Sequence, residues 1–304
     1  MDFLTELLTV FVNVTLPVFA IVLLGSLLGG RLELQARTLT RVAYYVFVPA
    51  FIFQAISKSE VPFAAAAEMM LFIVVVHLLA VAIAGAIGRL LGYSREVIAA
   101  LVMIASFGNV GNYGLAVIRF RLGEAALAPA TIYFVAVTIS AFVICVGAAG
   151  WAHGGSKGAL WGVLKTPALW ATVLALLVSS CGLTVPLMAE RTIGLLADAM
   201  IPVMLFALGL QLIEQRHVSL SRDVCWASGV RLLLAPAIAF LIAIPFGLGE
   251  LETAAGVLQA GMPTAILVSI IAKENDIVPE FVTSVVVVST FGSLVTLTLL
   301  MVAL

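Results

Sequence analysis

Apolar runs of about 20 residues recur along the whole chain, and short charged patches separate them. A run of this length crosses the hydrocarbon core of a bilayer as an α-helix, because each residue adds about 1.5 Å. Of the 304 residues, 63% are hydrophobic and only 10% are charged, whereas about a quarter of the residues in a soluble domain are charged. The runs are continuously apolar rather than alternating, which argues against a β-barrel. We therefore predict an all-α protein embedded in the lipid bilayer.

The apolar pattern predicts ten membrane spans. The sixth is the weakest, because Pro167 and Pro186 bracket a short run. The approximate spans are 7–29, 39–56, 68–91, 97–120, 126–151, 166–184, 191–213, 224–248, 253–273 and 280–303.

Lysine and arginine predict the orientation of these spans. Ten of the 15 basic residues fall in loops after odd-numbered spans, four fall in the opposite loops, and Arg231 lies within a span. Because basic loops stay in the cytoplasm, both termini are expected on the extracytoplasmic side. The acidic start, "MDFLTE", lacks the basic region of a signal peptide, so the first run is expected to remain as a span.

Composition and motifs argue against several classes of function. The net charge is −1, so the chain lacks the excess of basic residues that is typical of nucleic-acid-binding proteins. The three cysteines have no metal-ligand spacing, and the sequence contains no nucleophile elbow, zincin helix or phosphate loop. We therefore predict no enzyme activity, no cofactor and no metal site.

Two pairs of residues share one offset along the chain, which predicts an inverted repeat. Pro49 and Pro202 are 153 residues apart, and so are Gly108 and Gly261. Each half would hold five spans, an odd number, so the second half must insert upside down relative to the first. The predicted organisation is a first repeat at 1–152, a cytoplasmic linker at 153–165 and a second repeat at 166–304.

Residues that weaken helices lie at the centres of the fourth and ninth spans. The stretch "GNVGNYG", 108–114, places three glycines in the fourth, and each weakens a helix by about 1 kcal/mol relative to alanine. In "LQAGMPTAILVSIIA", Pro263 has no N–H to donate to the carbonyl of Gln259. Both spans are expected to break and to cross each other. The expected break residues are Gly108, Gly261, Pro49 and Pro202.

A break in the middle of the membrane frees backbone N–H and C=O groups that must find partners. Half-helix N-termini would offer N–H groups and positive dipole ends to an anion, and carboxamides would add donors and acceptors. An alternative is that the glycines allow close helix packing, that the asparagines bond between helices, and that Tyr113 is a packing residue. The predicted substrate-binding residues are Asn109, Gly111, Asn112, Tyr113, Gln259, Met262, Pro263 and Thr264.

Three ionisable residues, His77, Asp198 and Arg231, fall inside predicted spans. Charges there cost about 2.5–3.5 kcal/mol each on insertion scales and need a partner or a cavity. One hypothesis is that Asp198 or His77 relays protons while Arg231 neutralises an anionic substrate. The other is a structural pair of Asp198 with Arg231, or an Arg231 that reaches to the interface.

The sequence resembles the auxin efflux carrier family. The resemblance rests on "GNVGNYGLAVIRFRLGEAALAPATIYF" around the fourth span, with "VPAFIF", "IPVMLFALGLQL" and "AGMPTA" elsewhere. It implies ten spans in two inverted repeats, with crossing spans 4 and 9. It also implies a scaffold of spans 1, 2, 6 and 7 that dimerises, and a moving transport part of spans 3–5 and 8–10. The substrates that it implies are organic anions such as auxin or dicarboxylates.

Two departures from the family pattern narrow the expectation. Ala116 stands where the family commonly has proline, and the central loop is short, which resembles the bacterial branch and makes auxin itself unexpected. The sodium–bile acid symporters share the architecture, but Gln259 stands where they carry an acidic residue that helps to hold sodium. The resemblance thus implies an efflux carrier of a small organic anion in the plasma membrane, the inner membrane of a bacterium. The alternatives are a symporter coupled to sodium or protons, and a membrane sensor that does not transport.

Overall fold

The structure is a computed structural model that describes residues 3–58, 61–153, 167–215 and 218–304. It contains helices and no strand within those ranges. Seven helical runs are long and apolar enough to cross a membrane: 3–31, 36–57, 64–90, 124–153, 187–213, 222–246 and 279–303. The linker predicted at 153–165 lies, apart from His153, outside the described residues.

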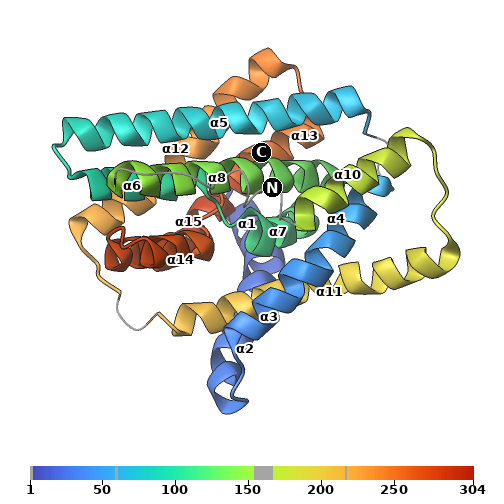
Figure 1. The fold of residues 1–304 in the computed structure, drawn as a ribbon, viewed down its shortest axis with the longest axis horizontal. Helices are drawn as coiled ribbons and strands as arrows, with labels where there is room; N and C mark the ends of the chain where they lie inside the picture. Colours follow the sequence, from blue (N-terminus) through green and yellow to red (C-terminus); the bar gives the residue numbers. More distant parts are fainter. Residues whose placement is uncertain (1–2, 59–60, 154–166, 216–217) are drawn as a thin grey trace.

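The first half of the chain forms helices in the predicted order (Figure 1). Proline and serine side chains mark several of the starts; for example, the Ser94 hydroxyl accepts a hydrogen bond from Val97 N–H and caps α6. The elements are α1 (Phe3–Val10), η1 (Phe11–Thr15), α2 (Leu16–Arg31), α3 (Ala36–Val42), η2 (Ala43–Phe47), α4 (Val48–Ser57), α5 (Phe63–Leu90), α6 (Arg95–Ser106), η3 (Val110–Gly114), α7 (Leu115–Leu122), η4 (Glu124–Ala126) and α8 (Leu127–His153).

The second half begins with a short helix and, like the first half, contains a divided helix between two long ones. The Ser221 hydroxyl caps α12 as Ser94 caps α6, and Gly247 ends α12 in the left-handed conformation that favours glycine. The elements are α10 (Pro167–Ser180), α11 (Leu187–Ile213), α12 (Arg222–Phe246), α13 (Glu250–Ala260), α14 (Ile266–Glu274) and α15 (Pro279–Ala303).

The predicted spans beyond the seven long runs are the short helix α10 and two interrupted helices. The fourth span is divided into α6 and the run from η3 to α7, and the ninth is divided into α13 and α14. Each of these pieces is too short to cross a bilayer by itself. Every predicted span therefore corresponds to a helix or to a divided helix.

The expected breaks at the two prolines are corrected by the structure. Pro202 lies inside α11, which continues without interruption. Pro49 is the second residue of α4, directly after the π-helical turn η2, and Val48 N–H donates to Ala43 C=O, so the helical run continues from 36 to 57. A π-turn shifts the hydrogen-bond register by one residue. This shift allows the helix to continue although proline has no N–H to donate.

The helices gather into two groups by their contacts. The most extensive contacts join α2, α3, α4, α10 and α11 in one group, and α5, α6, α8, α12, α13, α14 and α15 in the other. Figure 1 shows α5, α6 and α8 running side by side, with α2, α3, α4 and α11 gathered away from them. Smaller contacts join the groups, including those of η3 with α11 and of α4 with α8.

Glycines allow α2 and α11 to approach to backbone contact. A β-carbon at Gly25 would collide with the backbone carbonyl of Phe206, and one at Gly209 would collide with the carbonyl of Val22. The Ser26 hydroxyl donates a hydrogen bond of 2.9 Å to Gly209 C=O. Small residues at a close crossing are typical of helix pairs in membranes, so the first group is a tightly packed unit.

We expect Gly25→Ala to lower the free energy of unfolding by about 1–3 kcal/mol, because the added methyl meets backbone atoms and forces the helices apart. Gly30→Ala is the matched control on the same helix, since a β-carbon there has nothing within 4 Å. Its stability should be unchanged or raised by up to about 1 kcal/mol, the difference in helix propensity. Thermal unfolding in detergent measures both variants, and equal midpoints would contradict the close crossing.

Candidate functional site

The two divided helices meet each other at their breaks. Asn109 N–H donates to Pro263 C=O at 2.7 Å, and Ala265 N–H donates to Phe107 C=O at 2.8 Å. Gly108 and Thr264 thereby form an isolated antiparallel bridge. Two of the carbonyls freed by the breaks are satisfied in this way, as burial requires.

Each broken helix restarts immediately after the bridge. Asn109 precedes η3, and its carbonyl accepts from Gly114 N–H at 3.0 Å. Ala265 precedes α14 in an extended conformation. The first N–H groups of a helix have no partner within that helix, so two helix N-termini, with their positive dipole ends, lie beside the bridge.

Arg231 of α12 reaches this bridge from the side. Its side chain is 1% exposed, and its Nε, Nη1 and Nη2 atoms have no hydrogen-bond partner in the part of the chain that the structure describes. A β-carbon at Gly108 would collide with Nη2, so the guanidinium occupies the space that glycine leaves open. A buried guanidinium without a partner is costly.

Other buried polar atoms around the bridge also lack partners among the described residues. Besides the three guanidinium nitrogens of Arg231, they include Asn109 Nδ2, Gln259 Oε1 and Thr264 Oγ1. Gln259 is held by one bond of 3.1 Å from its Nε2 to Ala130 C=O, and its free oxygen lies against Gly114. Unsatisfied buried groups are few in native proteins, so this concentration marks the crossing as a candidate binding site.

The other residues predicted to bind substrate occupy different surroundings. Asn112 is half-buried, on the turn η3 that contacts α11 of the other helix group. Met262 is buried beside Gly108, and Gly111 packs against the Phe134 ring. Tyr113 lies edge-on to Phe19 and is hydrogen bonded to Ser293. The structure thus gives Tyr113 packing partners.

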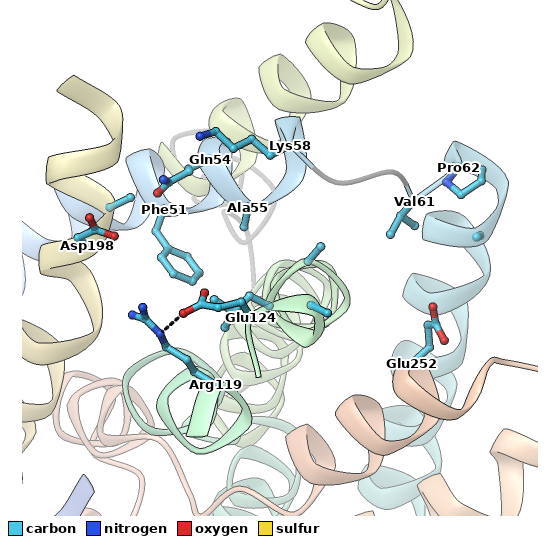
Figure 2. Close-up of a pocket in the computed structure, with 15 residues that line it drawn as sticks. Phe51, Gln54, Ala55, Lys58, Val61, Pro62, Arg119, Glu124, Asp198 and Glu252 are labelled. Carbon is cyan, nitrogen blue, oxygen red and sulfur yellow. Dashed lines mark hydrogen bonds and ion pairs between the residues drawn. The ribbon is translucent and has the colours of Figure 1, made fainter. Parts of the chain in front are cut away.

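Asp198 and Arg231 do not pair, which corrects the expectation of a structural ion pair. Asp198 lies on an exposed position of α11 and lines a cavity near Gln54 and Lys58 (Figure 2). The Asp198 carboxylate therefore faces this cavity, whereas the Arg231 guanidinium is buried at the crossing. His77 is fully buried in the middle of α5 and lies within electrostatic reach of Arg231.

The cavity has a volume of about 610 Å³ and lies between the two helix groups. Gln54 on α4 and Asp198 on α11 face it from one side, and Glu252 on α13 faces it from the other. Its wall on α8 includes Ala128, two residues before the carbonyl of Ala130 that holds Gln259.

Apart from Asp198, the charged residues that line the cavity were not among the residues predicted from the sequence. Arg119 Nε donates to Glu124 at 2.6 Å on the cavity wall (Figure 2), and Lys58 is paired with Glu190 at 2.8 Å. The available signal was the clustering of these charges at the ends of predicted spans on one side. Charged residues at the ends of spans are common in membrane proteins. The sequence alone therefore does not distinguish charges that line a cavity from charges at the membrane surface.

Similarity to known proteins agrees with this architecture. Residues 156–301 match the family model described as Membrane transport protein. An uncharacterized transporter of Methanothermobacter thermautotrophicus is 28% identical over 291 residues, which cover 93% of this chain and 95% of that protein. A putative malonate transporter of Rhizobium meliloti is 24% identical over 301 residues, which cover 94% of this chain and 93% of that protein.

A probable auxin efflux carrier component 1b of Oryza sativa is 26% identical over 141 residues, which cover 44% of this chain and 25% of that protein. Helical membrane spans and transporter relatives together define a membrane transporter and not an enzyme. The resemblance to the auxin efflux carrier family is thereby confirmed.

Proposed function

We propose that this protein is a secondary carrier of a small organic anion, such as a carboxylate, which binds where the two broken helices cross. The observation that carries the proposal is Arg231, a buried guanidinium with no partner among the described residues, placed against Gly108 at the bridge. An arginine fork matches a carboxylate in charge and shape and binds it through two hydrogen bonds.

The other groups at the crossing fit the same ligand. Asn109 Nδ2 is a free donor, and the N-termini of η3 and α14 add N–H groups and positive dipole ends. Gln259 Oε1 and Thr264 Oγ1 are free acceptors that suit a hydroxyl or a protonated group of the ligand. One permanent cation surrounded by neutral polar groups favours a compact anion over a cation.

The proposed transport mechanism is elevator-like alternating access. The group containing α5, α8, α12 and α13 would carry the crossing and move against the group of α2, α4, α10 and α11. The extensive contacts within each group, the smaller contacts between them and the intervening cavity support this division. In the state described, that cavity would be the path between the aqueous phase and the site.

Carboxylate flux through proteoliposomes tests the proposal. Purified protein would be loaded with one unlabelled carboxylate and supplied with the same labelled compound outside. Malonate is a suitable first probe, because one similar protein is named as a putative malonate transporter. Accumulation of label by counterflow supports an organic-anion carrier. An absence of counterflow across a panel of mono- and dicarboxylates would reject it and favour a membrane sensor.

Asn112→Ala is expected to reduce this flux to background without unfolding the protein. The Asn112 side chain is half-buried between the helix groups and makes no hydrogen bond within the described residues, so truncation removes a ligand or gating contact at little cost to stability. Counterflow and the thermal midpoint would be measured together. Wild-type flux in the variant would remove Asn112 from the transport mechanism.

A further inference from the structure

His77 combines complete burial, a fixed tautomer and proximity to the proposed anion site. Its Nδ1 lies 2.7 Å from Ile73 C=O, and a nitrogen that bonds a carbonyl must carry the proton. Nε2 is then the unprotonated nitrogen of the neutral ring. It has no partner among the described residues, although the side chain is 0% exposed.

Arg231 is a buried charged residue on α12, one of the helices packed against α5. The helices packed against α5 are α6, α8, α12 and α13, and Arg231 of α12 is within electrostatic reach of His77. Tyr133 donates to Glu252 C=O, and Cys145 is paired with Ser106. The remaining titratable groups of these helices lie at or near their ends: Arg95, Glu96, His153, Arg222, Asp223, Cys225, Glu250 and Glu252.

We propose that His77 takes up a proton when an anion binds to Arg231, so that the carrier moves the anion and the proton together. The inference rests on the proposed function, because it requires an anion at Arg231. With the site empty, a proton on His77 would place a second positive charge beside an unpaired guanidinium, in a region with little water to screen them. A carboxylate on Arg231 cancels the first charge and removes this repulsion.

Linkage makes the effect reciprocal. If the bound anion favours protonation of His77, then a proton on His77 must favour anion binding by the same factor. The proton comes from the water on the side where the anion enters, resides on Nε2, and leaves with the anion on the other side, while Nδ1 keeps its own proton. No other bond forms or breaks. A monoanion and a proton together carry no net charge across the membrane.

The test measures proton uptake and anion affinity with purified wild-type protein and malonate, or the carboxylate that the counterflow panel identifies. In weakly buffered solution, binding should take up one proton per anion. Between about pH 6 and about pH 8, where histidine titrates, the dissociation constant should rise by up to about tenfold per pH unit. Anion binding without proton uptake would overturn the inference and leave the proposed function intact.

His77→Gln should abolish both the proton uptake and the pH dependence, whatever affinity remains, because a carboxamide cannot accept a proton in this range. His153→Gln is the matched control, since the His153 ring lies at the end of α8 and is bonded to Asn275 C=O; its variant should keep the wild-type profile. An unchanged pH profile in His77→Gln would assign the proton elsewhere. If the wild-type protein binds no carboxylate, the proposed function itself fails.

Discussion

Arg231→Leu is expected to abolish carboxylate transport and to leave the fold as stable as in the wild type or more stable. The loss follows from removing the permanent positive charge and a two-pronged donor; each charge-assisted hydrogen bond contributes about 1.5–3 kcal/mol. Anion affinity should therefore fall by about a hundredfold or more. The free energy of unfolding should not fall, because the variant loses a buried cation that has no partner in the described residues. Leucine is apolar and favours the helix.

The combination of these two results distinguishes a binding residue from a structural one. If Arg231 were part of an internal network, its removal would leave partner groups buried and unpaired, and the thermal midpoint would fall. Counterflow in proteoliposomes and thermal unfolding of the same preparation provide both measurements. A destabilised variant that still carries the anion at the wild-type rate would contradict the assignment.

Gly108→Ala is expected to lower anion affinity by about ten- to a hundredfold while the protein still folds. The added β-carbon would collide with Nη2 of Arg231, the far end of a flexible side chain, and otherwise makes an ordinary contact with Met262. The adjustment that costs the least free energy is a movement of the guanidinium away from the bridge. Moving it by about 1 Å is enough to misalign a bound carboxylate, since such sites tolerate only about 0.5 Å.

The matched control is Gly229→Ala on α12, where a β-carbon would have nothing within 4 Å. That variant should bind the anion as the wild type does. A double-mutant cycle adds a second check. In an Arg231→Leu background, Gly108→Ala should have little further effect on anion affinity, because the guanidinium that the added methyl group displaces is already absent. Additive losses would show that Gly108 acts through the backbone and not through Arg231.

The sequence was sufficient to predict the helices and the positions of the two breaks. Continuous apolar runs determine where helices cross the membrane, and the structure has a helix or a divided helix at each of the ten places. The interruptions fall at Gly108 and Gly261 because glycine loosens the helix and Pro263 cannot donate to the preceding turn. These are local effects of residue type, so they could be read without tertiary information.

The wrong and missing predictions concern contacts between distant residues. A proline weakens a helix, but the π-turn η2 precedes Pro49 and α11 continues unbroken through Pro202, so both helical runs are continuous. The depth of Asp198 and Arg231 along their spans suggested a pair, yet depth does not specify which way a side chain faces. The role of Gly108 in making room for Arg231 depends on how α12 packs against the break, and no pattern in the sequence encodes that contact.

The most direct test of the account is a cryo-electron microscopy structure of the protein with malonate, or with the carboxylate that the counterflow panel identifies. We expect density for the anion at the crossing, bonded to the Arg231 guanidinium and within hydrogen-bond distance of Asn109 Nδ2. Density for the anion elsewhere, with Arg231 bonded to another protein group, would contradict the assignment of the crossing as the substrate site.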